Sequence, residues 1–147
     1  MSNYKIKLLS KTNTKTLDEI NSLLFQLDPT ILSISIEILR KIINSTTTFV
    51  FIATNTADEI IGMITLVSFP KLEGLNKTWI EDLVVDESYR GKGIAKELME
   101  KAFEKAKSLG VKSISLTSRS NRVIANAFYK QIGFKIKKTN YYIYVIK

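Results

Sequence analysis

The sequence predicts one α/β domain whose sheet is mixed but mostly antiparallel, with helices flanking it. Its 147 residues match the length of one ordinary domain. No internal repeat and no proline-rich linker divides the chain. Short β-branched or aromatic runs alternate with apolar stripes at helical spacing. We therefore expect a single domain over residues 1–147.

The expected elements follow the order β-α-α-β-β-β-α-β-α-β-β. Residues 4–9 alternate as a strand, and a capping box at Thr16-Leu17-Asp18-Glu19 opens a helix that Asp28-Pro29 ends. A second helical stripe runs from Ile31 to Ile42. Antiparallel strands are expected at 46–54 and 60–69, and a strand–helix–strand crossover over 79–117 puts two further strands parallel. The remaining predictions are strands at 79–85, 111–118, 134–138 and 141–146 and helices at about 91–109 and 121–132.

Composition excludes several classes of protein. With 45% hydrophobic and 24% charged residues, the profile is that of a soluble globular protein. No apolar run approaches the ~20 residues of a membrane span, and the N-terminus lacks the apolar core of a secretory signal. We expect a cytoplasmic protein with no membrane partner.

The chain has no cysteine and no histidine. Disulfides and cysteine metal sites are therefore excluded, and the commonest zinc ligand and catalytic base are missing. We expect no metal, and acid–base chemistry must use carboxylates, tyrosine, lysine or water. The net charge of +8 indicates either a solvated basic surface or an anionic ligand. Nucleic acid is not the expected partner, because no tract of five like charges and no aromatic–basic motif is present.

The stretch Arg90-Gly91-Lys92-Gly93-Ile94-Ala95 lies between a predicted strand and an amphipathic helix. A helix N-terminus leaves about four N–H groups without intrahelical partners, and an anion can accept from them. The glycines would allow close approach or positive φ, and the cations would add donors. A dinucleotide fingerprint would need glycine where Lys96 stands, and a P-loop is absent. A strand-to-helix turn that binds nothing is the alternative.

Residues 90–95 match the R/Q-x-x-G-x-G/A signature of the GCN5-related N-acetyltransferase (GNAT) family, which they resemble, with Ala95 where many members have glycine. The stretch "ANAFYKQIGF", residues 125–134, resembles the family's second motif, about thirty residues further on. The resemblance implies the GNAT fold, with its sheet splayed between the fourth and fifth strands. It also implies an N-acetyltransferase that uses acetyl-CoA as co-substrate.

The resemblance also implies which residues bind coenzyme A. The pyrophosphate would lie on the backbone of residues 91–95, beside three cations. The pantetheine arm would pair with the strand ending at Val85, and Asn121 or, preferably, Asn126 would bond its amide. The full set of implied cofactor-binding residues is Leu83, Val84, Val85, Arg90, Gly91, Lys92, Gly93, Ile94, Ala95, Lys96, Asn121, Asn126, Tyr129 and Lys130.

The implied reaction is direct attack of a neutral amine on the thioester. Tyr129 holds the position of the family's usual general acid, although it could be an ordinary half-buried tyrosine. With no histidine, the candidate bases are Glu81 and Asp82. Adjacent strand residues point to opposite faces, so only one can face the acceptor unless a bulge intervenes. Either carboxylate could instead orient the amine, relay through water, or serve only the structure.

The expected acceptor is the primary amine of a small molecule, such as an amino sugar or a polyamine. The stretch "IEDLVVD" is similar to the glucosamine-6-phosphate acetyltransferase branch, and the acceptor wall would come from residues 25–45 and 68–78. The alternatives are a protein lysine or N-terminal acetyltransferase and a non-catalytic basic binding module. The aromatic run Tyr141, Tyr142, Ile143 and Tyr144 suggests a covered C-terminal strand and a homodimer.

Overall fold

The computed structural model describes residues 2–147 and divides into two compact units. The first ends at Leu116 and the second is Thr117–Lys147. The prediction of a single domain stays a prediction. The first unit contains β1 (Tyr4–Leu8), α1 (Thr14–Leu27), α2 (Ile36–Ile43), β2 (Thr48–Asn55), β3 (Ile60–Pro70), β4 (Asn76–Val85), the 3₁₀ turn η1 (Glu87–Tyr89) and α3 (Ile94–Ser108), and the second unit contains α4 (Val123–Gln131).

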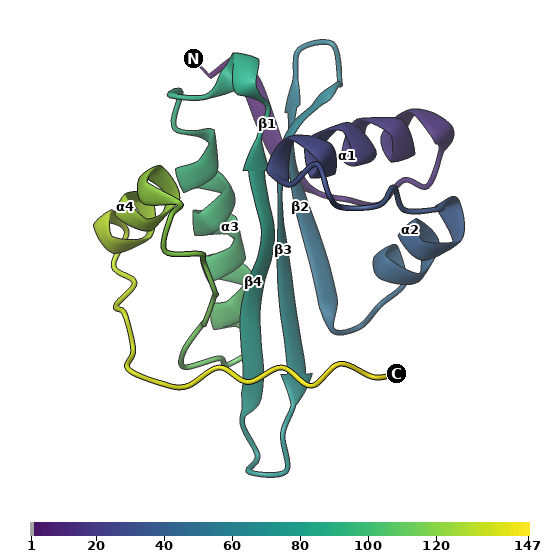
Figure 1. Ribbon diagram of the computed structural model, residues 1–147. Coiled ribbons are helices and arrows are strands. Elements are labelled where there is room, and N and C mark those ends of the chain that lie inside the picture. The colour runs from purple at the N-terminus through teal and green to yellow at the C-terminus, as the bar shows by residue number, and fades with distance from the viewer. Residues whose placement is uncertain (1) are drawn as a thin grey trace. The chain divides into compact units, whose positions relative to one another are not determined.

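The first unit is built on one antiparallel sheet in the order β1-β2-β3-β4 (Figure 1). The predicted hairpin of 46–54 with 60–69 is confirmed as β2 and β3. The connection between the strands predicted at 60–69 and 79–85 is shorter than expected, because the pairing of β3 with β4 continues out to Pro70 and Asn76. The sheet that carries the candidate site is therefore longer than the sequence pattern indicates.

Helices cover both faces of this sheet, α1 and α2 on one and α3 on the other (Figure 1). One core forms between the sheet and the first two helices, and its buried members include Ile20, Leu23, Leu39, Ile52 and Met63. On the other face, α3 buries Ile94, Leu98, Met99, Ala102 and Ala106. None of the helices in residues 2–147 has the length and apolar composition needed to span a membrane.

Glycine at position 62 lets α3 pack close to the sheet. A Cβ at Gly62 would lie 3.2 Å from the Val84 carbonyl oxygen and 3.3 Å from a Leu98 methyl group. These contacts are tighter than van der Waals packing allows without movement. Gly62 therefore helps to fix α3 against the strand that carries the candidate site.

Helices α1 and α2 begin elsewhere than predicted. The capping box at Thr16–Glu19 is wrong, because Asn13 caps α1 and its side chain accepts a hydrogen bond from the Thr16 N–H at 2.9 Å. Helix α2 begins only at Ile36, behind the cap Ser35. The Asn21 side chain bonds both the N–H and the carbonyl of Ile34, at 2.8 and 3.1 Å, and so holds that residue in the preceding loop.

The strand predicted over 111–118 is reduced to one bridge. Ser115 pairs with Trp79 in parallel orientation, through hydrogen bonds of 3.0 Å to Thr78 and Ile80. The parallel direction of the crossover is therefore confirmed at this pair, and the length of the strand is wrong. A longer strand would need continuous backbone contact between the two segments.

The two C-terminal strands predicted at 134–138 and 141–146 are also wrong. These residues carry no strand assignment, and the side chains of Tyr141–Ile146 are 74–85% exposed. Alternating and aromatic residues favour a strand only when a neighbouring backbone accepts and donates along its length. No ladder partner for these segments occurs among residues 2–147.

Candidate functional site

The turn between β4 and α3 takes its shape from two glycines. Gly91 has φ +76° and Gly93 has φ +84°, both in the left-handed region that residues with a side chain avoid. Because this backbone cannot be helical, α3 begins at Ile94 and not near residue 91 as predicted. The two glycines are needed first of all for conformation.

The start of α3 is left uncapped. Gly93 is its N-cap and supplies no side-chain hydrogen bond, and the first intrahelical bond runs from the Glu97 N–H to the Gly93 carbonyl at 3.1 Å. The N–H groups of Ile94, Ala95 and Lys96 therefore have no acceptor within the helix. A Cβ built on Gly91 or Gly93 would meet no atom within 4 Å, so the space above the turn is open. This arrangement suits an oxyanion.

Three cations surround this turn, as predicted. Arg90 is exposed, and its Nε donates to the Val85 carbonyl at 3.1 Å. Lys92 places its ammonium 4.8 Å from the centroid of the Tyr89 ring. Lys96, on the first turn of α3, lies 3.9 Å from Glu100 in an exposed ion pair. All three remain accessible to a ligand, and two are oriented by contacts within the turn.

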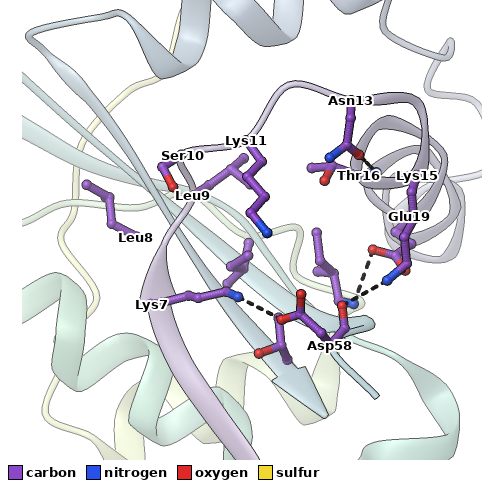
Figure 2. Close-up of a pocket in the computed structure, with 13 residues that line it drawn as sticks. Lys7, Leu8, Leu9, Ser10, Lys11, Asn13, Lys15, Thr16, Glu19 and Asp58 are labelled. Atoms are coloured by element: carbon purple, nitrogen blue, oxygen red, sulfur yellow. Dashed lines mark hydrogen bonds and ion pairs between the residues drawn. The ribbon is translucent and has the colours of Figure 1, made fainter. Parts of the chain in front are cut away.

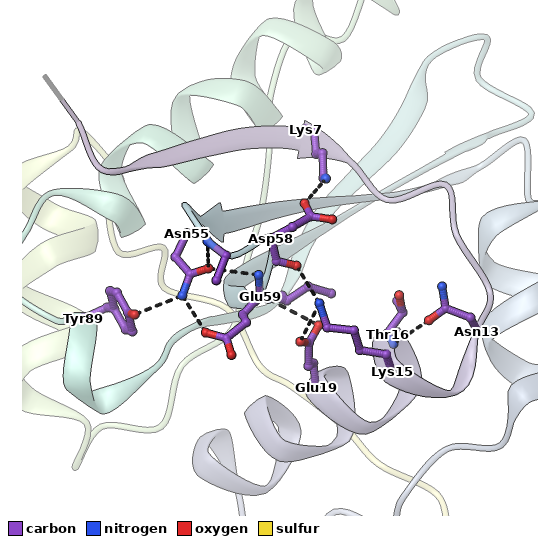
Figure 3. A network of polar contacts seen from close by, with 11 residues as sticks. Lys7, Asn13, Lys15, Thr16, Glu19, Asn55, Asp58, Glu59 and Tyr89 are labelled. Carbon is purple, nitrogen blue, oxygen red and sulfur yellow. Dashed lines mark hydrogen bonds and ion pairs between the residues drawn. The ribbon is translucent and has the colours of Figure 1, made fainter.

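The turn is tied to distant parts of the first unit by contacts that the sequence did not indicate. Gln26 donates to the Asp86 carboxylate at 2.9 Å and accepts from the Glu87 N–H at 3.0 Å. Asn55 donates to the Tyr89 hydroxyl at 3.1 Å, as Figure 3 shows. The Tyr89 ring in turn contacts the Lys92 ammonium. Asn55, at the end of β2, therefore helps to position a cation of the turn.

Of these supporting residues, only Asp86 could have been predicted from its neighbours in the sequence. Asp86 follows an apolar strand, and its side chain accepts from the Ser88 N–H at 2.9 Å, an Asx turn typical of this residue type. Its pKa is lowered, first by the hydrogen bond from Gln26. Gln26 and Asn55 lie far away in sequence, and no spacing rule connects them to the turn.

A β-bulge interrupts β4 at the two predicted carboxylates. Opposite the segment Met63–Thr65 of β3, β4 runs from Val84 to Glu81 and so contains one additional residue. Asp82 takes φ +53°, a left-handed conformation that Asp tolerates better than most residues. The bulge removes the strict alternation that would send Glu81 and Asp82 to opposite faces.

Both carboxyl groups have raised pKa values. For Glu81, partial burial is the largest cause and the neighbouring charge of Asp82 adds to it. For Asp82, burial raises the pKa and a hydrogen bond with Thr65 partly opposes the shift. A carboxylate with a raised pKa is a better proton acceptor at neutral pH than an ordinary one. The pair is therefore suited to the role of a base.

The outer edge of β4 is open beside the bulge. Along this edge only Ser115 pairs with β4, and within residues 2–147 no ladder continues past Ile80. Leu83 is half-buried, Val84 and Val85 are buried, and their side chains are thus fixed in place. Unpaired backbone groups at a sheet edge can bind an extended ligand in the manner of an added strand.

The second unit carries the remaining predicted residues. Tyr129 in α4 is 9% exposed, and its ring lies 5.7 Å from that of Phe128 and 5.9 Å from that of Phe134. Burial raises the pKa of Tyr129, and Arg122 partly opposes this. The Asn126 side chain donates to the Arg119 carbonyl at 3.0 Å, so part of its capacity holds the preceding loop. Asn121 and Lys130 are exposed.

Three comparisons with known proteins bear on the site. The family model described as acetyltransferase (GNAT) family matches residues 17–134. Streptothricin acetyltransferase of Escherichia coli is 36% identical over 75 residues, which are 48% of this chain and 43% of that protein. The chain thus matches less than half the length of this curated relative.

Solved structures show the same fold. An aminoglycoside acetyltransferase from an uncultured soil metagenomic sample aligns with TM-score 0.86 at 19% identity, covering 99% of this chain and 97% of that one. Glucosamine-6-phosphate N-acetyltransferase from Arabidopsis thaliana aligns with TM-score 0.80 at 23% identity, covering 97% and 99%. With the family match over most of its length, the chain belongs to the acetyltransferase (GNAT) family.

Proposed function

We propose that this protein transfers an acetyl group from acetyl-CoA to the primary amine of a small molecule by direct attack. The observation that carries the proposal is the uncapped start of α3, where Gly93 at φ +84° leaves open space above free N–H groups. Helix starts elsewhere in the first unit are closed by a side chain, that of Asn13 or Ser35. An uncapped start beside exposed cations fits the polyanionic coenzyme.

The residues present fit the pyrophosphate and pantetheine of coenzyme A. The N–H groups of residues 94–96 and the exposed side chains of Arg90, Lys92 and Lys96 would bind the pyrophosphate. The open edge at Leu83–Val85 would pair with the pantetheine arm. Bound acetyl-CoA would supply a thioester carbonyl as the electrophile. Asn121, Asn126, Tyr129 and Lys130 of the second unit remain proposed ligands.

The proton transfers require a base and an acid from this chain. Glu81 or Asp82, each with a raised pKa, would accept a proton from the amine. Tyr129, whose pKa is raised by burial, keeps its phenolic proton at neutral pH and would donate it to the departing sulfur. The surroundings of Tyr129 favour the protonated state that an acid needs. The raised pKa of Glu81 and Asp82 makes either carboxylate, when ionised, a stronger base than an ordinary one.

Amino sugars are the first acceptors to test. Relatives are named for streptothricin, an aminoglycoside and glucosamine 6-phosphate, and these names support a small-molecule amine. The segments proposed as the acceptor wall, 25–45 and 68–78, expose apolar side chains including Phe25, Leu32 and Leu72. Such surfaces suit a ligand with an apolar or ring-shaped body.

Release of free thiol from acetyl-CoA is the direct test. The purified protein would be assayed with aminoglycosides, streptothricin, glucosamine 6-phosphate, polyamines, amino acids and lysine peptides. We expect acceptor-dependent thiol release with at least one amino sugar. Release with peptides alone would reject the small-molecule acceptor, and acetyl-CoA binding without release in any arm would reject the enzyme.

We also propose a homodimer formed through residues 141–146. Six consecutive side chains here are tyrosines or aliphatic residues, all 74–85% exposed in the single chain. Exposed apolar runs of this kind are commonly covered by a partner. Light scattering at micromolar concentration should give twice the mass of the chain, and a monomer mass would reject the dimer.

A further inference from the structure

A pocket lies in the first unit, and none of its lining residues belongs to the turn before α3. It is bounded by the end of β1, the segment leading into α1, and the β2–β3 turn (Figure 2). Its lining combines lysines and hydroxyl residues with buried aliphatic residues such as Leu9, Ile52 and Ile60. None of the residues assigned to acetyl transfer above lines it.

The charges around this pocket do not balance. Lys7, Lys11 and Lys15 face two carboxylates, Asp58 and Glu19. Lys7 donates to the Asp58 carboxylate at 2.8 Å, and Lys15 donates to the Asp58 carbonyl at 3.1 Å and lies 3.7 Å from Glu19. The pKa of Asp58 is lowered, first by its hydrogen bond from Lys7, and this carboxylate is therefore ionised. One positive charge remains.

Lys11 carries that excess charge. Its ammonium has no ion-pair or hydrogen-bond partner among residues 2–147. Figure 2 shows the side chain reaching toward the middle of the pocket. The first turn of α1 lies beside it, and the positive end of the helix dipole adds to the field.

Two buried hydroxyl groups supply an independent observation. Thr16 is 7% exposed and Thr54 is 4% exposed, and both line the pocket. Neither hydroxyl has a hydrogen-bond partner in the part of the chain that the structure describes, although neither oxygen is fully enclosed. Both hydroxyls are therefore available to donate a hydrogen bond to a ligand in the pocket.

The size of the pocket limits that ligand. Its volume is about 130 Å³, close to the ~150 Å³ of a cavity that holds benzene. We propose that the pocket binds a small oxyanion, a phosphate or a short carboxylate, through the Lys11 ammonium and the hydroxyls of Thr16 and Thr54. Lys7 keeps free donors for the same ligand, because an ammonium has three and Asp58 takes one.

Amide NMR titration tests this assignment without any acetyl-transfer assay. The full chain would be titrated with inorganic phosphate, sulfate or acetate at constant ionic strength made up with chloride. We expect saturable shifts at the amides of residues 14–16 and of Thr54 with phosphate or acetate, and the tighter arm identifies the ligand type. The amides of Gly91 and Gly93 report the coenzyme turn separately, so failure at one site is not failure at the other.

Three variants sharpen the test. Lys11→Gln should weaken binding of the preferred anion about tenfold, as expected for loss of one charge-assisted hydrogen bond. Lys107→Gln, an exposed lysine of α3, is the matched control and should change nothing. Thr16→Val should weaken binding by about fivefold without lowering the thermal midpoint in chloride, because the hydroxyl it removes makes no hydrogen bond to the residues that the structure describes.

Three results would overturn the proposal. They are shifts that do not saturate, equal affinity in wild type and Lys11→Gln, and an equal loss in Lys107→Gln. An equal loss in Lys107→Gln would mean that anion binding depends only on the net positive charge of the chain.

Discussion

Two helices of the first unit, α1 and α3, begin beside lysines and hydrogen-bond donors, but in opposite ways. At α1 the Asn13 side chain accepts from the Thr16 N–H, so the helix start is closed. At α3 the cap is Gly93, without a side chain, and the N–H groups stay open. A helix start therefore has backbone N–H groups free for a ligand only where no side chain caps it. At α1, any anion must be bound by side chains.

The variant with the largest expected effect separates catalysis from the proposed binding of acetyl-CoA at the start of α3. Tyr129→Phe keeps the buried ring and removes only the phenolic proton, so turnover should fall about 10²- to 10⁴-fold, the usual value of general acid catalysis. Acetyl-CoA affinity measured by calorimetry should stay near that of the wild type. Wild-type turnover on the true acceptor would mean that water, or the thiolate unaided, completes this step.

Replacement of Gly93 attacks the open helix start itself. Gly93→Ala should weaken acetyl-CoA binding by about tenfold or more, since the left-handed turn is strained and backbone N–H groups lose their alignment. Gly74→Ala is the matched control: Gly74 has φ +81° with open space at its Cβ, but lies in the β3–β4 hairpin.

Both variants should lose similar stability, about 1–2 kcal/mol for a left-handed residue with a side chain. The comparison between the two glycines therefore isolates ligand binding from backbone strain. Equal coenzyme affinity in Gly93→Ala and Gly74→Ala, measured by calorimetry, would remove the pyrophosphate from this turn.

The bulge carboxylate gives a prediction with opposite signs for activity and stability. Asp82→Asn preserves the left-handed backbone, because Asn tolerates this region as Asp does. Burial raises the folded-state pKa of Asp82, so the ionised form is disfavoured in the fold. Ionised Asp82 therefore lowers the free energy of unfolding. This destabilisation is absent below the unfolded-state pKa and complete above the folded-state pKa.

Asp82→Asn should therefore raise the thermal midpoint at pH 7 and change it little at pH 3. If Asp82 is the base, the same variant lowers kcat/KM at neutral pH, and higher pH partly restores the rate by deprotonating the amine in solution. Glu81→Gln is the parallel variant. If neither substitution changes the rate at neutral pH, water and not a carboxylate accepts the proton of the amine.

The smallest effect concerns the closed helix start. Asn13→Ala should cost about 1 kcal/mol of stability, the usual value of an N-cap side chain, and leave acetyl-CoA affinity unchanged. Chemical denaturation and calorimetry measure the two quantities. A large loss of coenzyme affinity would show that the two helix starts are not independent.

Local sequence predicted most of the first unit and the position of the glycine turn before α3. The glycines at 91 and 93, the cations around them and the apolar stripe of α3 are close in sequence, so spacing alone places them together. Capping was less predictable, since the sequence offered a capping box at Thr16 and the folded helix is capped by Asn13 instead. The supports Gln26 and Asn55 were invisible because their partners lie about sixty and thirty residues away.

The sequence by itself determined the α/β class, the residues of the turn before α3 and the absence of histidine and cysteine chemistry. The tertiary structure decided where strands exist. Residues 111–118 and 134–146 carry strand-like patterns, but a strand needs a neighbouring backbone, and pairing is a property of two segments. It also decided that β4 contains a bulge at Asp82, because an additional residue becomes visible only in register against Met63 and Thr65. The alternation of side chains along one strand carries no information about its register with the neighbouring strand, so it cannot reveal an unpaired residue.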